Sequence, residues 1–270
     1  MKKKILIFGK NSFIGSSLYT YLKNKHFVKI KSFNKKTLKY LNDFDYIINC
    51  AINKNYIYQK YAKHNDFDLQ IVNKLDRNTN LIFLSTRKIY KPKGNIFEKS
   101  KIECKNNYEK NKLITEKKIL KVKNKKSIIL RISNLIGFKK NNPRKIHFTY
   151  HDFFKKSLKK KEFIHHKDEY KDFLDINTFS RIINLIIKKK VFGIYNVSIG
   201  EKIFLKDINS WLSSSIKNKK DFRIIKLKKS DKKNELSFYL NNSKLKKKLG
   251  IQIGVTELKK ECLKLSKKLK

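Results

Sequence analysis

The sequence predicts an α/β fold in which helices cover both faces of a parallel, doubly wound sheet. Three observations support this prediction. The chain has 270 residues, of which 40% are hydrophobic, enough for one large α/β domain with a smaller companion. Short continuous apolar runs, the first at 5–8, are typical of strands that are buried on both faces. These runs alternate with stretches of helical character, which is the pattern of βαβ units.

The expected elements follow one another in order through the first half of the chain. The strand at 5–8 leads through a glycine-containing turn into a helix at 16–23. Because crossovers between parallel strands are right-handed, a ligand crevice is expected at the carboxyl ends of the strands. The further strands are expected at 27–33, 45–51, 81–85 and 127–132, and the further helices at 66–75 and 108–122.

The pattern weakens after Gly137. Residues 138–170 are basic and irregular, apart from one expected helix at 151–159. The later expectations are a helix at 177–187, a strand at 193–197, a lysine-rich connection at 217–233 and a terminal helix at 257–269.

The charge of the chain is extreme, with 68 Lys and Arg against 22 Asp and Glu, a formal net charge of +46. Six of the 68 are arginine, so 62 are lysine, and the lysines are spread over the whole length. Nucleic-acid readers usually depend on the bidentate arginine fork. We therefore interpret the charge as compositional, as an AT-rich genome would produce, and expect no nucleic-acid partner. The charge would still attract an anionic substrate.

The three cysteines, Cys50, Cys104 and Cys262, have no paired spacing. The sequence therefore predicts neither a metal site nor a disulfide framework, and free thiols suit a cytoplasmic location. The apolar run near the N-terminus ends after four residues, too short for a signal peptide. No apolar run reaches the roughly 18 residues of a membrane span.

A glycine-containing turn at 8–15 follows the first strand and opens the first helix. Two of the eight glycines of the chain, Gly9 and Gly15, lie in this window. Glycine permits a tight turn, and the free N–H groups of a helix N-terminus attract a pyrophosphate. The alternative is an ordinary strand-to-helix turn.

Tyr108 and Lys112 have the spacing that places two side chains on one helix face. The spacing alone means little, because 13 tyrosines among 62 lysines should produce about three such pairs by chance, and the chain has four. The pairs begin at Tyr19, Tyr21, Tyr56 and Tyr108. Position favours Tyr108, which starts a helix shortly after a strand that ends in Ser85 and Thr86.

These features together resemble the extended short-chain dehydrogenase/reductases, the nucleotide-sugar epimerase, dehydratase and reductase group, whose fold is of Rossmann type. Ser12 stands where the middle glycine of the family's T-G-x-x-G-F-I-G loop is usual, and Lys171 stands where an arginine is usual. Seven segments are similar to family motifs and occur in the family's order: 8–15, 45–51, 84–90, Tyr108-x-x-x-Lys112 with Glu116, 130–137, 171–176 and 196–197.

The resemblance implies roles for particular residues. Tyr108 would protonate a sugar carbonyl, the Lys112 ammonium would favour the phenolate and hold the nicotinamide ribose, and Thr86 would orient the carbonyl. A nucleotide-binding domain would comprise 1–137 and 172–200, and a smaller substrate-binding portion 138–171 and 201–270. The cofactor residues would be Gly9, Asn11, Ser12, Phe13, Ile14, Gly15, Asn34, Lys35, Ala51, Tyr108 and Lys112; the substrate residues would be Asn134, Arg144, His151 and Lys171.

The residues after Thr86 argue against two of the reactions known in the family. Family dehydratases have an acidic pair after the hydroxyl residue, whereas Arg87 and Lys88 follow Thr86 here. The GDP-fucose synthase type has a cysteine where this chain has Lys88. The turn after the second strand reads Asn34-Lys35-Lys36, without the carboxylate that would repel a 2′-phosphate, which favours NADP(H), with NAD possible.

The first hypothesis is therefore a reductase of a nucleotide-diphosphate 4-keto-6-deoxy sugar in surface-polysaccharide synthesis, similar to the dTDP-4-dehydrorhamnose reductase type. A homodimer is compatible with this hypothesis. Three alternatives stay open: an NAD-dependent C4 epimerase, a non-catalytic NADP(H)-binding member of the fold, and a nucleic-acid binder.

Overall fold

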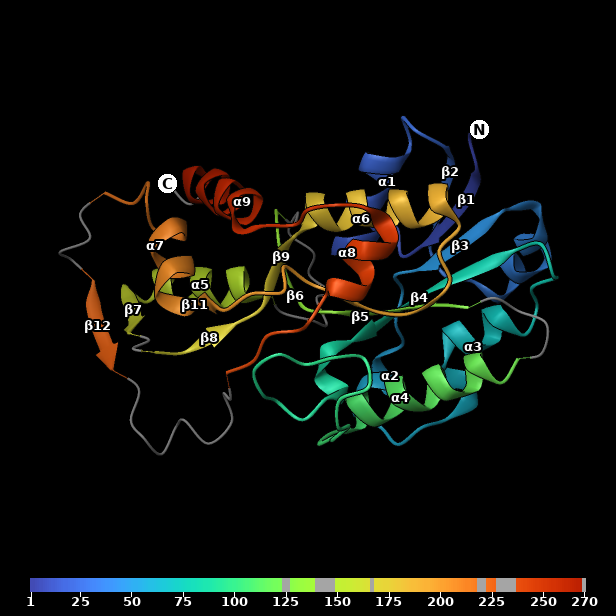
Figure 1. Ribbon diagram of the computed structural model, residues 1–270, viewed down its shortest axis with the longest axis horizontal. Helices are drawn as coiled ribbons and strands as arrows, with labels where there is room; N and C mark the ends of the chain where they lie inside the picture. Colours follow the sequence, from blue (N-terminus) through green and yellow to red (C-terminus); the bar gives the residue numbers. More distant parts are fainter. Residues whose placement is uncertain (123–126, 139–148, 166–167, 218–221, 227–236, 269–270) are drawn as a thin grey trace. The chain divides into compact units, whose positions relative to one another are not determined.

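A six-stranded sheet, in the order β10-β5-β4-β3-β1-β2, combines five strands from the first half of the chain with β10 from the second half. The computed structural model describes residues 1–122, 127–138, 149–165, 168–217, 222–226 and 237–268 (Figure 1). The pairings from β5 to β2 are all parallel. The strands are β1 (Lys4–Phe8), β2 (Phe27–Lys31), β3 (Tyr46–Asn49), β4 (Asn80–Thr86), β5 (Ile128–Ile132) and β10 (Gly193–Val197).

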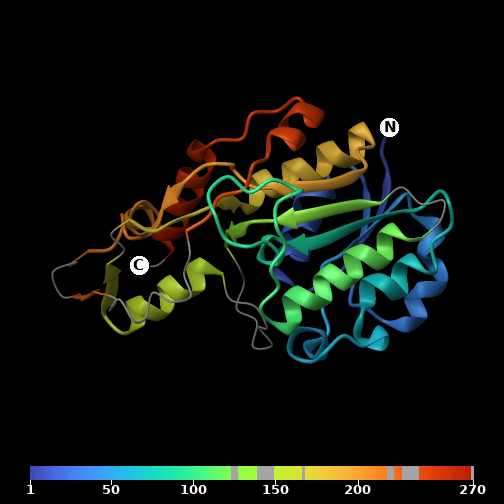
Figure 2. The ribbon, with the colours of Figure 1, turned by 60° about the horizontal axis from the view of Figure 1, so that its bottom comes forward.

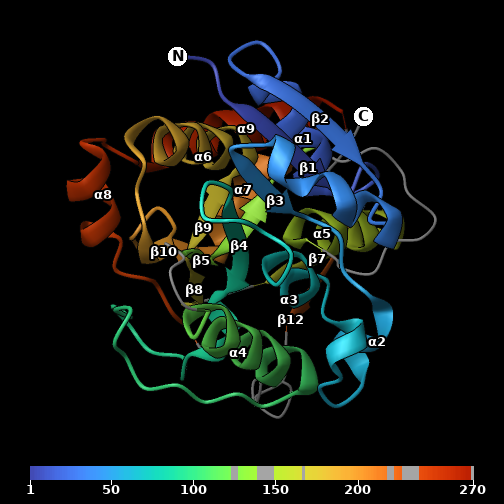
Figure 3. The same cartoon turned by 90° about the vertical axis from the view of Figure 1, so that its right-hand side faces the viewer.

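Helices cover both faces of this sheet, as the predicted α/β class requires. Helices α1 (Phe13–Leu22) and α6 (Ile176–Lys189) lie over one face, and α3 (Phe67–Val72) and α4 (Asn107–Leu120) over the other (Figure 3). The 14-residue helix α4 runs in front of β4 and β5, and α3 lies beside it (Figure 2). This doubly wound arrangement confirms the predicted fold class.

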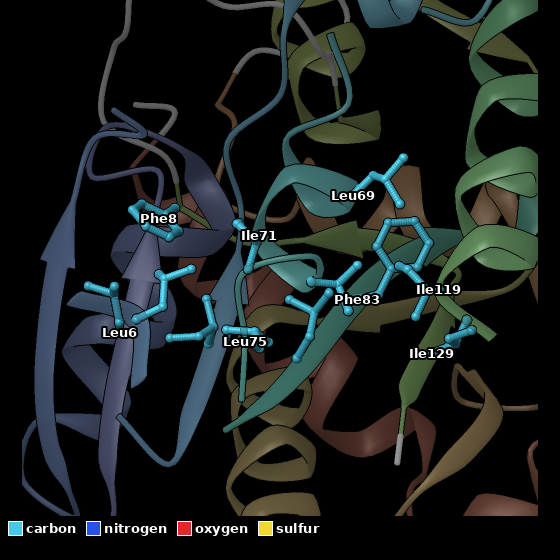
Figure 4. Close-up of a cluster of buried hydrophobic side chains, with 12 residues drawn as sticks. Leu6, Phe8, Leu69, Ile71, Leu75, Phe83, Ile119 and Ile129 are labelled. Carbon is cyan, nitrogen blue, oxygen red and sulfur yellow. The ribbon is translucent and has the colours of Figure 1, made fainter. Parts of the chain in front are cut away.

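Alternating residues of the strands build the core under α3 and α4. Leu6 and Phe8 of β1 and Phe83 of β4 point to the same side as Leu69 of α3 and Ile119 of α4 (Figure 4). All of these side chains are buried. Because both faces of the sheet are covered at its centre, β1, β3, β4 and β5 appear in the sequence as mainly apolar runs, whereas the edge strand β2 alternates apolar residues with exposed lysines.

Clustering of the chain gives two compact units. Unit 1 comprises residues 1–91, 98–132 and 179–196, which include the six-stranded sheet except for Val197. Unit 2 comprises 92–97, 133–178 and 197–270. These boundaries differ by several residues from the ones expected at 137, 171 and 200, and the division into cofactor and substrate roles stays a prediction.

Unit 2 is built from short strand pairs and helices. Strand β6 (Asn134–Ile136) pairs with β9 (Phe173–Asp175), β7 (Glu162–His165) with β12 (Arg223–Lys226), and β8 (Tyr170–Lys171) with β11 (Ile203–Phe204). Helix α7 packs against α9. The helices are α5 (Tyr150–Lys159), α7 (Leu205–Leu212), α8 (Ser243–Leu249) and α9 (Val255–Lys267).

The element predictions are close in unit 1 and poorer in unit 2. All the strands expected up to residue 132 are present, as are the helices expected near 16–23, 66–75 and 108–122. The expected connection at 217–233 instead contains β12, and α7, α8 and the short helix α2 (Lys54–Tyr58) were not predicted. Strands of two to four residues and helices of five to eight residues are too short to show a clear periodicity in the sequence.

Candidate active site in unit 1

The turn between β1 and α1 brings backbone groups closer than a side chain would permit. Gly9 has φ +101°, and a Cβ atom there would lie 2.8 Å from the carbonyl carbon of Cys50. A Cβ atom on Gly15 would collide with the carbonyl oxygen of Gly9. The N–H of Gly9 donates to the carbonyl oxygen of Lys31 at 2.8 Å, which ties the turn to the end of β2. Both glycines are therefore required by the close approach of the backbone.

Ser12 is the N-cap of α1. Its hydroxyl accepts a hydrogen bond from the N–H of Gly15 and donates to the carbonyl oxygen of Gly9, both at 2.9 Å. The serine side chain thus occupies part of the helix N-terminus. Asn11 and Ile14 flank this turn, and the buried Phe13 anchors the first turn of the helix.

The turn that contains Gly9 and Gly15, here called the glycine cradle, is compatible with the pyrophosphate of a dinucleotide. The cradle leaves no room for a Cβ atom at either glycine, and the first turn of α1 supplies backbone N–H donors beside it. Ala51 follows β3 at the neighbouring strand end, where its N–H donates to the side-chain oxygen of Asn49 at 3.0 Å. Asn11, Ile14 and Ala51, which the sequence predicts as cofactor residues, border this turn and the neighbouring strand end.

The turn after β2 has no carboxylate. Asn34 is exposed and caps the 3₁₀ helix η1 (Lys35–Asp43) by accepting from the N–H of Lys36 at 2.9 Å. Lys35 and Lys36 are also exposed. A phosphate at this turn would therefore meet two solvent-accessible ammonium groups.

Thr86 ends β4 and caps the 3₁₀ turn η3 (Arg87–Ile89). Its hydroxyl accepts from the N–H of Lys88 at 3.2 Å, and the residue is 7% exposed. Accepting this bond leaves the hydroxyl hydrogen for donation to another group. Arg87 is half-buried and Lys88 is exposed, so the positions after Thr86 bear cations.

Helix α4 places Lys112 beside the end of β4, with Tyr108 one helical turn before it. The Lys112 ammonium is buried and donates to the carbonyl oxygen of Leu84, two residues before Thr86, at 2.9 Å. It also lies over the Phe83 ring at 4.5 Å and the Tyr56 ring at 5.7 Å. Tyr108 is half-buried in the first turn of α4, which begins at a capping box formed by Asn106 and Glu109.

A carboxylate that sequence reasoning missed faces this lysine. Asp68 of α3 is buried, and its Oδ2 lies 3.9 Å from Lys112 Nζ. The sequence shows Asp68 as a carboxylate within the expected helix at 66–75. Nothing in the sequence distinguishes this buried carboxylate from an exposed one.

Five residues from the quoted motifs meet in one buried network. Arg131 of β5 donates to both carboxylate oxygens of Glu116, at 2.6 Å to Oε2, and Glu116 also accepts from the Ser85 hydroxyl. Arg131 further donates to the Tyr90 hydroxyl, which donates to Asn196 Oδ1, each at 2.8 Å. The network fixes Ser85, the neighbour of Thr86, against α4. The motif residues that are distant in sequence therefore support the same end of β4.

A family model for the NAD dependent epimerase/dehydratase family matches residues 5–198, more than two thirds of the chain. The chain belongs to this family. No curated protein matches the sequence.

Three solved structures share the fold over nearly the whole chain. One is the UDP-N-acetylglucosamine 4-epimerase of Methanobrevibacter ruminantium M1, with 16% identity, coverage of 99% of this chain and 98% of that chain, and a TM-score of 0.78. Another is RMD of Pseudomonas aeruginosa complexed with NADPH, with 16% identity, coverage of 99% of each chain and a TM-score of 0.75. A third is the dTDP-glucose 4,6-dehydratase of Bacillus anthracis, in complex with NAD, with 17% identity, coverage of 98% and 96%, and a TM-score of 0.72.

The residues of this family member that we expected to bind substrate belong to unit 2. Asn134 donates to the carbonyl oxygen of Asp172 at 3.0 Å, which brings it beside Lys171, a half-buried residue of β8. His151 is 3% exposed near the start of α5, where the neighbouring Tyr150 ring meets Phe173 of β9 at 5.5 Å. Arg144 lies outside the described residues.

Neither a metal cluster nor a membrane helix is found in the described part of this family member. No group of three His, Cys, Asp or Glu side chains there could hold a metal ion. None of the described helices has both the length and the hydropathy of a membrane span.

Proposed function

We propose that this chain is an NADPH-dependent reductase of a nucleotide-diphosphate 4-keto-6-deoxy sugar. The observation that supports this most directly is the arrangement of Lys112 against Leu84, which brings α4 to the strand end that bears Thr86. Family membership supports a nicotinamide dinucleotide as cofactor.

The proposed chemistry needs a proton donor, a charge and an orienting hydroxyl. Bound at the glycine cradle, the cofactor would supply a hydride. Tyr108 would give its phenolic proton to the sugar carbonyl oxygen as the carbonyl carbon is reduced. The Lys112 ammonium would stabilise the resulting phenolate and hold the ribose hydroxyls. Thr86 would donate its free hydroxyl hydrogen to the same carbonyl oxygen.

Reduction is favoured over dehydration by the charges after Thr86. Removing water from a sugar needs an acid and a base beside it, and Arg87 and Lys88 supply neither a carboxylate nor a carboxylic acid. The exposed Lys35 and Lys36 favour NADPH over NADH, because a 2′-phosphate would be attracted there.

The substrate would be bound by groups of unit 2. Asn134, His151 and Lys171 are proposed to bind the sugar nucleotide, with Arg144 as a further candidate. A diphosphate needs cationic partners, and Lys171 is half-buried, so its charge is less screened than that of an exposed lysine.

The proposal is tested by incubating the purified protein with a panel of nucleotide-linked 4-keto-6-deoxy sugars and NADPH. Reduction consumes NADPH, which is followed as loss of dihydronicotinamide absorbance, and Tyr108→Phe serves as the inactive control. Nucleotide released from denatured protein is identified in parallel. Tightly held NAD, with interconversion of C4 epimers and no consumption of NADPH, would instead identify a redox-neutral epimerase.

A further inference from the structure

Asp68 is a buried carboxylate that the proposed chemistry does not use. It is 6% exposed, on α3, and its Oδ2 lies 3.9 Å from the Nζ atom of Lys112, which is 7% exposed. Its other oxygen, Oδ1, is buried outside strict hydrogen-bond geometry among the described residues, although the Asn49 side chain lies close enough to favour its charged form. A carboxylate in such surroundings is costly unless an opposite charge lies beside it.

Burial is also costly for the positive charge of the Lys112 ammonium. Its ammonium has three N–H donors, and among the described residues its one hydrogen-bond acceptor is the Leu84 carbonyl oxygen. The Phe83 and Tyr56 rings offer their faces to the charge but accept no conventional hydrogen bond. Asp68 is thus the negative charge paired with this ammonium, and each group offsets the desolvation of the other.

We propose that Asp68 is a positioning residue for Lys112, and that its carboxylate keeps the buried ammonium oriented toward the nicotinamide ribose. The inference rests on the proposed role of Lys112 in holding the cofactor. Asp68 itself does not contact the reacting atoms in this proposal. It acts through Lys112, so its effect on cofactor binding depends on that lysine.

The pH dependence of the pair follows from the groups around Asp68. These are Lys112 on α4, Asp66 at the N-cap of α3, Cys50 after β3 and Tyr56 on α2. Burial raises the pKa values of Cys50 and Tyr56, so both stay uncharged near neutral pH. Burial also raises the pKa of Asp68, to about 7, although the Lys112 ammonium opposes the shift. The carboxylate therefore ionises near neutral pH, and pairing with Lys112 strengthens as the pH rises through this range.

The test is a fluorescence titration of NADPH against the intact protein, below and above neutral pH. Asp68→Asn should raise the Kd of NADPH about tenfold on the alkaline side, within the range measured for contacting residues. The loss should be smaller on the acidic side, where Asp68 of the parent protein is protonated. Asp43→Asn removes the same charge from an exposed position of unit 1 and should leave the Kd unchanged.

A double-mutant cycle with Lys112→Met separates positioning from packing. When Lys112 is already Met, Asp68→Asn should change the Kd no further, because Asp68 then has no ammonium to position. The inference is overturned if Asp68→Asn binds NADPH like the parent protein, or if it weakens binding equally with and without Lys112.

The double-mutant cycle also tests the inference if Asp68→Asn does not fold. If Asp68→Asn alone is unfolded, a folded double variant with the affinity of Lys112→Met supports the inference, because it attributes the damage to the unpaired ammonium. A double variant that is also unfolded overturns it. Failure of the proposed reaction is seen separately, as lack of sugar reduction by a parent protein that binds NADPH.

Discussion

Arg131 and Glu116 form a buried ion pair that joins β5 to α4, with Nη2 of Arg131 2.6 Å from Oε2 of Glu116. The two side chains are 6% and 1% exposed. Glu116 lies one helical turn after Lys112 and also accepts from Ser85, the neighbour of Thr86. The pair therefore holds α4 and the end of β4, which bear the proposed catalytic residues, in place.

Glu116→Gln should destabilise the protein by about 3 kcal/mol or more, because it leaves the Arg131 guanidinium buried without its counter-charge. Urea denaturation of the intact protein, followed by circular dichroism, measures the change. Glu162→Gln is the matched control. It removes the partner of Arg223, whose side chain is 75% exposed, and should cost less than about 1 kcal/mol. Equal losses in the two variants would contradict a structural role for the buried pair.

Tyr108→Phe should lower turnover by at least ~100-fold and leave cofactor affinity nearly intact, because it removes the proton donor but keeps the ring. Lys112→Ala should reduce both turnover and cofactor affinity, since one ammonium has two roles. Thr86→Val should reduce turnover while the protein stays folded. Steady-state kinetics and cofactor titration on the same samples separate the effects. Tyr21→Phe, in another Tyr-x-x-x-Lys pair, is the control, and near-normal turnover in Tyr108→Phe would disprove the assignment.

NADPH should bind several-fold more tightly than NADH, and Asn34→Asp should shift the preference toward NADH. The substitution introduces a carboxylate that repels a 2′-phosphate and can bond to ribose hydroxyls. Aspartate caps a helix about as well as asparagine, so η1 should persist. Fluorescence titration of both cofactors decides the question. A clear NADH preference in the parent protein would contradict the NADP(H) assignment.

Acidification through the histidine range should weaken the fold through His26. Its side chain is 4% exposed, its Nδ1 accepts from the N–H of Lys3 at 3.2 Å, and its Nε2 lies 2.9 Å from Asn184 Oδ1. Burial, with a smaller contribution from the Lys188 charge, lowers the pKa of His26 below its usual 6.5. Below that value the unfolded chain binds a proton that the folded protein excludes, so the free energy of unfolding falls as the pH falls.

The contribution of His26 has a slope of at most about 1.4 kcal/mol per pH unit. The measurement is the free energy of unfolding between neutral pH and about one unit below the ordinary histidine pKa. His26→Gln should flatten the curve relative to the parent protein, because glutamine keeps polar groups but does not titrate there. His64→Gln, at an exposed position, should leave the slope unchanged.

Lys171→Ala should raise the KM for the sugar nucleotide and leave NADPH affinity unchanged. Removing Lys267, an exposed residue at the end of α9, should change KM little. Raising the salt concentration should lower kcat/KM more than kcat, because exposed charges steer substrate capture and are screened. If Lys267 proved as important as Lys171, or if the protein retained DNA at physiological salt, the compositional interpretation of the +46 charge would be wrong.

The sequence determined the architecture of unit 1 because its determinants are local. Continuous apolar runs such as 5–8 predict buried strands by themselves, and Gly9 and Gly15 mark a turn where a Cβ atom does not fit. The alternation of strands and helices then fixes the doubly wound class. The pattern was less informative in unit 2, where two-residue strands such as β8 and β11 exist only through their pairing.

The tertiary structure decided what depends on burial and on contacts between distant residues. The sequence places Asp68 in a helix but does not distinguish it from the exposed carboxylates of the chain. Packing of α3 beside α4 buries it within 3.9 Å of the Lys112 ammonium, 44 positions further along the chain. Ser85, Glu116 and Arg131 likewise appear as separate weak motifs and become one network only when β4, α4 and β5 meet. Charge pairing in a protein interior depends on distance and desolvation, which the order of residues alone does not specify.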